Sequence, residues 1–200
     1  MTKAQDPTIA CLLLAAGGSS RLGQAKQLVS DGGESLVRTA ARKALNISQE
    51  VWVVTGAYAE KVVTELQDIP VQCIHNPNWK SGMGSSIAQG IRAVGEQPDG
   101  ILILLCDQWK LLNSDLEKLV SAWKKQPGSV CAARWNDTSG PPAIFPRRLF
   151  GKLRNLDDDR GARSVLKAEQ DIISVQIPNA QFDLDTPQDL ALLHGGAGQR

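Results

Sequence analysis

The sequence predicts a single three-layer α/β domain with a mostly parallel sheet, for three reasons. Short β-rich apolar runs alternate along the chain with segments of helical periodicity. Several of these runs are apolar throughout, as expected for strands that helices cover on both faces. The 200 residues suit one domain that spans residues 1–200. An alternation of this kind implies parallel strands joined by right-handed crossovers.

Six apolar runs are strand candidates, and five stretches show apolar residues at helical spacing. The predicted strands are 9–14, 51–55, 71–74, 101–105, 130–133 and 172–177. The predicted helices are 36–45, 59–67, 83–94, 116–125 and 160–167. Two helix starts carry signals: Ser114 to Glu117 fits a capping box, and Thr186 precedes a proline at the first helical position. The ends, 1–7 and 195–200, are expected to be frayed.

The composition argues against a nucleic-acid-binding face, a disulfide scaffold and a membrane protein. The 22 basic and 21 acidic residues nearly cancel, so any anion site must be local. Cys11, Cys73, Cys106 and Cys131 form no CxxC pair and lie in or beside apolar runs, as core cysteines of a reducing compartment do. No apolar stretch approaches the ~20 residues of a membrane span, and residues 1–7 lack a signal-peptide core. We therefore expect a cytoplasmic protein with neither nucleic acid nor a membrane as partner.

A glycine-rich loop follows the first predicted strand, over residues 14–26. Glycines let backbone N–H groups approach a phosphate closely, and Arg21 and Lys26 add two cations. Two standard phosphate motifs fail here, because Gln24 stands where a Walker loop needs lysine and Ser20 stands where Gly-x-Gly-x-x-Gly needs glycine. On the residues alone, a phosphate cradle and a flexible surface turn both stay open.

Three aspartates follow predicted strands, at the edge where sheets of this type bind ligands. Asp107 follows the most apolar run, 101–105, whereas Asp183 and Asp185 follow the last strand and precede a helix. Carboxylate oxygens suit a hard cation such as Mg²⁺, which offsets charge that develops on phosphates. The alternative for Asp107 is a residue that begins a turn. Asp183 is compatible equally with support of a metal ligand and with a structural turn.

The segment 82–86 opens a predicted helix with glycine and two serine hydroxyls. The N–H groups at such a helix start suit an anion or the edge of a base. Ordinary N-capping by a serine is the alternative.

Taken together, these blocks resemble the MobA-like nucleotidyltransferases, and in particular the molybdenum cofactor cytidylyltransferase branch. The loop 14–26, followed by Gln-Leu, is similar to the signature loop of that family. Further blocks agree in order and span residues 11 to 190: Asn76-Pro77-Asn78-Trp79, Gly82-Met83-Gly84-Ser85-Ser86, Cys106-Asp107-Gln108, Gly140-Pro141-Pro142, Asp159-Arg160-Gly161-Ala162-Arg163 and Asp183-Leu184-Asp185-Thr186-Pro187.

The resemblance implies a Rossmann-like fold of the nucleotide-diphospho-sugar transferase type. It also implies Mg²⁺-dependent transfer of CMP from CTP to the terminal phosphate of molybdopterin or molybdenum cofactor, with release of pyrophosphate. A molybdoenzyme or its chaperone is the further partner that this activity suggests.

The resemblance also implies roles for individual residues. The catalytic residues are Arg21, Lys26 and Asp107, and the metal ligands are Asp107 and Asp185. The nucleotide contacts fall on Leu14, Ala15, Ala16, Gly17, Gly18, Ser19, Lys26, Asn76, Gly82, Met83, Ser85 and Ser86. The acceptor contacts fall on Gly140, Pro142, Asp159 and Arg163. From the residues alone, the run 140–142 is equally a rigid connecting loop, and Asp159 with Arg163 a surface ion pair.

Two rival functions stay open. One keeps the fold but uses GTP, or a sugar or alditol phosphate as acceptor. The other is a carrier that binds a pterin cofactor without catalysis, against which the retention of Lys26, Asp107 and Asp185 argues. Ala16 and the block 82–86 are of the cytidylyl type, so we expect a preference for CTP over GTP.

Trp109 departs from the family pattern, in which proline usually follows Asp-Gln. An indole at this position is compatible with a wider turn, with stacking on a ligand and with packing under a loop.

Overall fold

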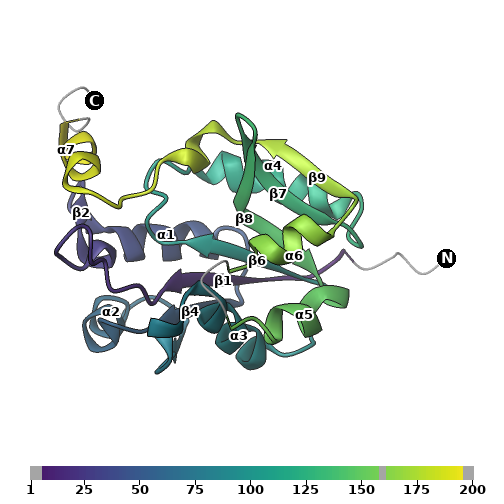
Figure 1. Cartoon of the computed structure of the whole chain (residues 1–200), viewed down its shortest axis with the longest axis horizontal. Helices are drawn as coiled ribbons and strands as arrows, with labels where there is room; N and C mark the ends of the chain where they lie inside the picture. The colour runs from purple at the N-terminus through teal and green to yellow at the C-terminus, as the bar shows by residue number, and fades with distance from the viewer. Residues whose placement is uncertain (1–5, 158–160, 196–200) are drawn as a thin grey trace.

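Within the residues that the structure describes, 6–157 and 161–195, a seven-stranded sheet runs through the middle of the molecule (Figure 1). The structure is a computed structural model. In the order in which they lie side by side, the strands are β5 (Gln72–His75), β4 (Val51–Thr55), β1 (Ile9–Ala15), β6 (Gly100–Leu105), β8 (Thr138–Pro146), β7 (Val130–Trp135) and β9 (Ile172–Gln176). Neighbouring strands are parallel except where β8 pairs with β6 and with β7. The mostly parallel sheet that the sequence predicts is confirmed.

Helices and short turns connect these strands. The α-helices of the described residues are α1 (Leu36–Leu45), α2 (Ala59–Glu65), α3 (Met83–Val94), α4 (Asn113–Lys124), α5 (Phe150–Arg154), α6 (Arg163–Ala168) and α7 (Pro187–Gly195). None of them is long and apolar enough to cross a membrane. Four single turns of 3₁₀-helix are η1 (Lys26–Leu28), η2 (Trp79–Ser81), η3 (Arg147–Leu149) and η4 (Pro178–Gln181). A separate two-stranded ribbon joins β2 (Ser30–Asp31) to β3 (Glu34–Ser35).

Alternate residues of β1 enter two separate hydrophobic cores, one on each face of the sheet. Cys11 and Leu13 pack in a core with α1, α2 and α4, whereas Leu12 and Leu14 pack in a core with α3, α5 and α6. Successive side chains of a strand point to opposite faces of the sheet, so the residues of β1 reach both cores when helices cover both faces. Figure 1 shows α3 and α5 lying together below the sheet, and the two helices are in contact. The predicted three-layer architecture is therefore confirmed.

Strand β8 lies inside the sheet although it contains Pro141, Pro142 and Pro146. Proline cannot donate to a strand ladder, so inside sheets it is confined to edges, strand ends and bulges. The pairing of β8 with β7 shifts register between Ala132 and Ala133, and Pro141 and Pro142 lie opposite this step. The two prolines therefore occupy a bulge. The connecting-loop interpretation of the run 140–142 is wrong, because these residues belong to a strand.

The predicted bounds of α1, α3 and β4 agree with the structure residue for residue, and most others differ by a few residues at the ends. Strand β8, helix α5 and the ribbon of β2 and β3 are not among the predicted elements. The predicted helix over 160–167 corresponds to α6, which begins at Arg163. Of the ends expected to be frayed, residues 1–5 and 196–200 lie outside the described residues.

The start of α4 differs from the predicted capping box at Ser114. The helix begins at Asn113, and the N–H of Leu112 before it donates to the carboxylate of Asp115. The same carboxylate accepts a hydrogen bond from the side chain of Asn179 at 2.8 Å. The prediction that Ser114 caps the helix is wrong: the helix begins two residues earlier than such a cap requires, and the contact with Asn179 holds Asp115 at its third position.

The start of α7 agrees with its prediction. The hydroxyl of Thr186 accepts a hydrogen bond from the N–H of Asp189, and the carboxylate of Asp189 accepts one from the N–H of Thr186. This reciprocal pair satisfies two N–H groups that a helix start otherwise leaves without partners.

Gly90 in α3 packs directly on Leu12 of β1, and a Cβ atom at Gly90 would overlap the leucine side chain. We expect Gly90→Ala to lower the free energy of unfolding by about 1–2 kcal/mol, because overpacking costs about 1–3 kcal/mol and alanine returns at most ~1 kcal/mol of helix propensity. Urea denaturation measures the change. Gly151→Ala in α5 is the control, since a Cβ there meets nothing within 4 Å. Equal changes in the two variants would contradict this account of Gly90.

Candidate functional site

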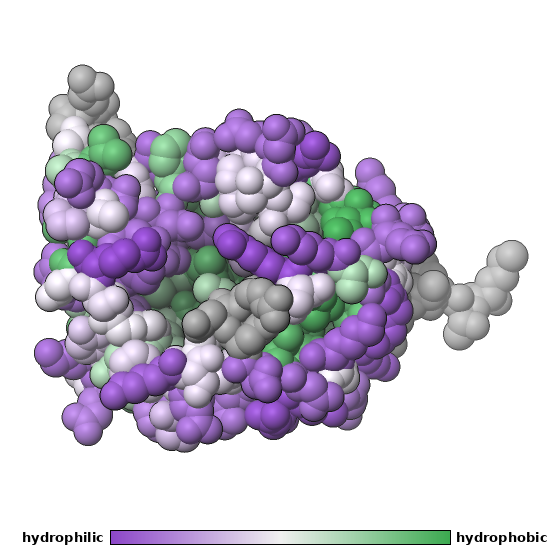
Figure 2. Space-filling view, in the orientation of Figure 1, coloured by the Kyte–Doolittle hydropathy of each residue, from purple (hydrophilic) through white to green (hydrophobic). Residues whose placement is uncertain are grey.

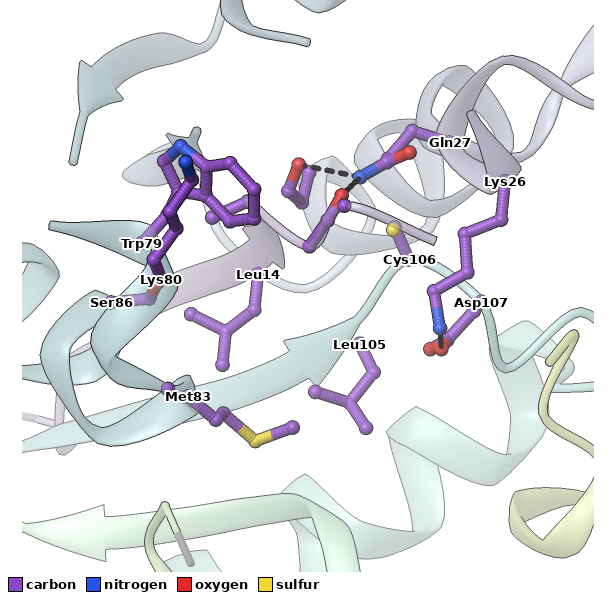
Figure 3. A pocket seen from close by; sticks show the side chains of 15 residues that line it. Leu14, Lys26, Gln27, Trp79, Lys80, Met83, Ser86, Leu105, Cys106 and Asp107 are labelled. Atoms are coloured by element: carbon purple, nitrogen blue, oxygen red, sulfur yellow. Dashed lines mark hydrogen bonds and ion pairs between the residues drawn. The ribbon is translucent and has the colours of Figure 1, made fainter. Parts of the chain in front are cut away.

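The carboxyl ends of β1 and β6 open into a cleft of about 390 Å³. Figure 2 shows this face of the molecule hollowed, with apolar residues on the floor and polar residues around it. In Figure 3, Lys26 and Asp107 lie at one end of the cleft, and Trp79 and Met83 lie toward the other. The residues that line it are Leu14, Ala15, Ala16, Gly17, Gly18, Lys26, Gln27, Trp79, Lys80, Gly82, Met83, Ser86, Leu105, Cys106 and Asp107.

Gln27 anchors the start of the glycine-rich loop through hydrogen bonds of its side chain. Its side chain is fully buried, and its amide donates to the carbonyls of Ala15 at 3.0 Å and Gly17 at 2.7 Å. These two bonds tie the end of β1 to the start of the loop. The hydroxyl of Ser19 accepts a hydrogen bond from the N–H of Lys26 and so closes the far side of the loop. These bonds anchor the loop at both ends, although Gly17, Ser20 and Arg21 are exposed on the surface.

Trp79 forms the opposite wall of the cleft. Its ring lies against Gly18, where a Cβ atom would come within 2.9 Å of the indole. Glycine at position 18 therefore lets the loop approach the tryptophan closely. Lys80 places its ammonium 5.5 Å from the centre of the same ring. The sequence gives no sign of this contact, because Gly18 and Trp79 lie on segments that only the sheet brings together.

Helix α3 begins at the cleft with Gly82, whose φ of 106° favours glycine. Asn76 is 2% exposed and donates to the hydroxyls of Ser85 at 2.9 Å and Ser86 at 3.0 Å. The hydroxyl of Ser85 in turn donates to the carbonyl of Gly82 or of Asn78. Asn76 and Ser85 thus fix the first turn of α3 from behind, while Ser86, Gly82 and Met83 face the cleft.

Four charged side chains meet at the end of the cleft near β6. The ammonium of Lys26 donates to a carboxylate oxygen of Asp107 and, at 2.9 Å, to one of Asp185. Arg21 donates to the second oxygen of Asp185 at 2.8 Å. The side chains of Lys26 and Asp107 are 17% and 11% exposed, whereas that of Arg21 is 72% exposed. The inner pair therefore interacts with far less solvent screening than the outer pair.

Backbone pairing brings Asp185 beside Asp107. The N–H of Leu184 donates to the carbonyl of Asp107 at 3.0 Å, and Gln108 forms a bridge with Asp183. The segment after η4 therefore runs alongside the turn after β6. Because this turn carries Asp107, the two predicted metal ligands face the same point although they are distant in sequence.

The protonation of this cluster follows from its burial and its charges. Burial alone would lower the pKa of Lys26, but the charge of Asp107 and the hydrogen bonds to both aspartates outweigh it and hold the pKa above its usual value. Burial, reinforced by the charges of Asp107 and Asp185, raises the pKa of Asp183 to about 7. The Oδ1 atom of Asp183 is also buried without a hydrogen-bond partner among the described residues. Asp183 is therefore a third carboxyl group at this site and not an exposed turn residue.

A second, apolar cavity of about 180 Å³ continues from the cleft beyond Met83 and Leu105, which line both. It lies between the sheet and the helices α3 and α6. Arg163 is the one charged side chain among the described residues that line it: Met83, Ile87, Ile103, Leu105, Pro141, Ala143, Phe145, Ala162, Arg163 and Leu166.

Trp109 packs away from the cleft, against the C-terminal segment. Its ring meets that of Phe182 edge to face, with centroids 6.3 Å apart, and contacts a small core that includes Leu36 and Leu184. The ammonium of Lys110 lies 4.8 Å from the centre of the indole and 3.8 Å from the centre of the phenyl ring. Of the three interpretations of Trp109, the structure favours packing under a neighbouring segment.

The predicted site residues divide into three groups. Leu14, Ala15, Ala16, Gly17, Gly18, Lys26, Gly82, Met83, Ser86 and Asp107 line the cleft. Ser19, Asn76 and Ser85 support its walls, and Arg21 and Asp185 stand at its rim. On the acceptor side, Arg163 lines the apolar cavity and Gly140 and Pro142 lie in the adjoining bulge, whereas Asp159 lies outside the described residues. Gln27 is the supporting residue that sequence reasoning missed, although it directly follows Lys26.

Residues 11–173 match the model of the MobA-like NTP transferase domain. The chain belongs to this family. It is a nucleotidyltransferase, and the resemblance seen in the sequence is confirmed.

Curated relatives match nearly the whole chain at low identity, and their names differ. Nicotine blue oxidoreductase of Paenarthrobacter nicotinovorans is 30% identical over 92% of this chain and 95% of its own length. A probable molybdenum cofactor guanylyltransferase of Trichormus variabilis is 26% identical, over 94% of this chain and 91% of its own. The molybdenum cofactor cytidylyltransferase of Escherichia coli is 25% identical, over 90% and 93%. The names of these relatives therefore agree on neither the nucleotide nor the acceptor.

Solved structures confirm the fold. A crystal structure of a Mycobacterium tuberculosis protein superposes with a TM-score of 0.79 at 22% identity, over 95% of this chain and 98% of its own. A second crystal structure from that organism, at a TM-score of 0.74 and 21% identity, is a complex with manganese and covers 93% and 97%.

The residues at the rim of the cleft fit a divalent metal ion. Asp107 and Asp185 present oxygen atoms at one point, where both bond to the ammonium of Lys26. Among the described residues, no group of three or more His, Cys, Asp or Glu side chains could hold a metal ion. Mg²⁺ commonly uses only one or two carboxylates, with water and phosphate oxygens as its other ligands. Two aspartates beside the glycine-rich loop are therefore a set of ligands that fits such an ion.

The pH dependence of stability tests the state of Asp183. Its pKa rises from 3.8 to about 7 on folding, so between these values the folded chain holds a proton that the unfolded chain has released. Stability then falls as the pH rises through this window. We expect Asp183→Asn to be more stable than the wild type at pH 8 by about 1–3 kcal/mol, because the charged form of a buried group is removed. Urea unfolding in EDTA at pH 5 and pH 8 measures the difference.

Asp189→Asn is the control for this experiment, because hydrogen bonds from Thr186 lower the pKa of Asp189. This variant should lose stability at pH 8, the opposite sign. An Asp183→Asn protein no more stable than the wild type at pH 8 would show that Asp183 is ionised in the folded chain.

The packing of Trp109 on Phe182 predicts an energetic coupling between the turn after β6 and the C-terminal segment. We expect Trp109→Leu to lower the free energy of unfolding by about 1–3 kcal/mol. In a double-mutant cycle with Phe182→Leu, the two losses should overlap by about 0.5–1.5 kcal/mol, the usual worth of an aromatic pair. Strictly additive losses in urea denaturation would show that the edge-to-face contact contributes nothing.

Proposed function

We propose that the chain transfers CMP from CTP to the terminal phosphate of molybdopterin or molybdenum cofactor, in a Mg²⁺-dependent reaction that releases pyrophosphate. The observation that carries this proposal is the meeting of Lys26, Asp107 and Asp185 at the end of the cleft. A phosphate-binding cation and two oxygen ligands for a hard metal ion are the groups that nucleotidyl transfer requires.

In this reaction an oxygen of the acceptor phosphate attacks the α-phosphorus of CTP. The bond from the α-phosphorus to the bridging oxygen breaks, and pyrophosphate leaves with the electron pair. N–H groups of the loop around Gly17 and Gly18, with Lys26 and Arg21, hold the triphosphate and stabilise its developing charge. Asp107 and Asp185 would hold Mg²⁺, which neutralises charge on the phosphates when it is bound. Because these groups bind and orient both reactants, the reaction needs no covalent enzyme intermediate.

The apolar cavity beside the cleft offers space for the flat ring system of a pterin acceptor, which also carries polar edge groups. Arg163 supplies a cation for an acidic group of the acceptor, and Met83 and Leu105 place the cavity directly beside the cleft. A sugar or alditol phosphate would bring hydroxyl groups, each of which costs about 1–3 kcal/mol when it is buried without a partner. The polar edge of a pterin carries the same kind of cost, so the pterin acceptor rests on the family resemblance and not on the lining of the cavity. Its product would pass to a molybdoenzyme or its chaperone.

The end of the cleft near Trp79 supports a pyrimidine base. The methyl group of Ala16 narrows the approach to this end, and the first turn of α3 offers the N–H of Met83 for the edge of a base. Asn76 holds this turn fixed through Ser85 and Ser86. Rigid polar groups of this kind can reject a wrong partner by up to about 10⁴–10⁵-fold, whereas apolar fit alone gives about 10–200-fold.

A pyrophosphate-release assay with each of the four NTPs and molybdopterin tests the proposal. We expect release with CTP, and in competition a ratio of CTP to GTP in kcat/KM above the roughly 200-fold that shape alone supplies. Asp107→Asn should lower the rate by about 10²–10³-fold, the usual cost of one well-aimed electrostatic group. Asp137→Asn, in the exposed turn between β7 and β8, is the control and should match the wild type.

Three results would count against parts of this assignment. A preference for GTP, or parity with CTP, would overturn the cytidylyl assignment and leave the family unchanged. Release with alditol phosphates but not with molybdopterin would overturn the acceptor. Near wild-type turnover of Asp107→Asn at saturating Mg²⁺ would remove Asp107 from the metal site.

A further inference from the structure

The ammonium of Lys26 lies between the two carboxylates assigned to the metal. It donates to Oδ2 of Asp107 and to Oδ1 of Asp185, while Arg21 donates to Oδ2 of Asp185. Three carboxylate oxygens at this point therefore already accept hydrogen bonds from cationic side chains. A divalent ion held by Asp107 and Asp185 would take its ligand atoms from these same two carboxylates.

A lysine and a metal ion cannot use these oxygens together without strong repulsion. Mg²⁺ binds carboxylate oxygens at about 2.0–2.1 Å, so an ammonium bonded to the same atoms would stand within a few ångströms of it. The side chains of Lys26 and Asp107 are mostly buried, and a low local dielectric strengthens the repulsion between like charges. Binding of the metal therefore requires Lys26 to leave the carboxylates.

We propose that Lys26 is an internal counter-cation, which keeps Asp107 and Asp185 from holding a divalent ion until a triphosphate draws its ammonium away. This proposal rests on the assignment of the two aspartates to the metal. The further claim is that metal and nucleotide bind together, because the same lysine must leave the aspartates for the metal and contact the triphosphate.

The position of Lys26 allows this exchange. Its backbone N–H is held by Ser19 in the phosphate loop, while its ammonium reaches across the cleft to β6 and the C-terminal segment. A lysine carries its charge on a flexible four-carbon stem, so the ammonium can turn from the aspartates to phosphate oxygens while its backbone stays fixed. Figure 3 shows the side chain extended along the end of the cleft toward Asp107.

Arg21 does not share this role, although it bonds to the same aspartate. Its side chain is 72% exposed, and exposed ion pairs are weak because water screens them and two long side chains must be ordered. Arg21 is therefore the control for Lys26, because both cations bond to Asp185 but only that of Lys26 is mostly buried.

Titration with Mn²⁺, followed by electron paramagnetic resonance of the unbound ion, measures the exchange without nucleotide or acceptor. We expect Lys26→Gln to bind Mn²⁺ roughly 10–100-fold more tightly than the wild type, the range usual for coupled sites. Arg21→Met should change the affinity by no more than about 5-fold. Lys26→Arg keeps the positive charge and should bind Mn²⁺ as weakly as the wild type does.

Further variants keep the test decisive. Lys26→Met replaces Lys26→Gln if the glutamine variant loses its native circular dichroism, and adding Asp107→Asn to either should abolish the gained affinity. Unchanged or weaker Mn²⁺ binding in folded Lys26→Gln would overturn the proposal, as would equal gains in Lys26→Arg. Because the mixture contains no CTP or molybdopterin, a wrong substrate assignment would leave this result untouched, and the reverse also holds.

Discussion

The hydrogen bond from the N–H of Leu184 to the carbonyl of Asp107 joins the last part of the chain to the end of a central strand. Around it, Gln108 is 5% exposed and its amide donates to the carbonyls of Pro141 and Ala180. These bonds fix the turn after β6, the bulge of β8 and the end of η4 against one another. These bonds fix the position of Asp185 relative to Asp107, and so hold together the two segments that carry the charged side chains of the site.

This junction places three acidic groups close together, which is unfavourable by itself. Two unit charges 4 Å apart interact by about 4 kcal/mol at an effective dielectric constant of ~20. The structure offsets the repulsion in two ways: Lys26 bonds to Asp107 and Asp185, and Asp183 holds its proton to near neutral pH. The repulsion within the acidic cluster is thus offset by one cation, on Lys26, and one proton, on Asp183.

Periodic segments of the sequence predict the fold well, and segments fixed by distant contacts do not. The bounds of α1, α3 and β4 follow from apolar spacing because each element is continuous and is covered by its neighbours in the expected way. Strand β8 is not predicted, because Pro141 and Pro142 interrupt its apolar pattern. The bulge opposite β7 accommodates these two prolines inside the sheet. The predicted cap of α4 is wrong for a similar reason: Asp115 is held by a hydrogen bond from Asn179, a residue that is distant in sequence.

The candidate site shows the same division. The loop, Asp107 and Asp185 follow from their places after apolar strands together with the family resemblance. The support that Gln27 gives to two loop carbonyls depends on the loop folding back over it, and a glutamine at that place in a sequence looks like any polar residue. Trp109 meets Phe182 only because the C-terminal segment returns to β6. Sequence reasoning therefore finds the groups that act on a ligand more readily than the groups that hold them.

Two adjoining cavities of different character lie at this end of the sheet. The charged groups stand at the ends of β1 and β6, whereas the apolar cavity lies beyond Met83, between the sheet and α3 and α6. Met83 can take this dividing position because Gly161 has no side chain: a Cβ there would come within 3.0 Å of the methionine sulfur. Residues of the apolar cavity can therefore change without disturbing Lys26, Asp107 or the phosphate loop. A family with this arrangement can keep one fold and one phosphate site while its members act on different molecules, as the different names of the relatives of this chain require.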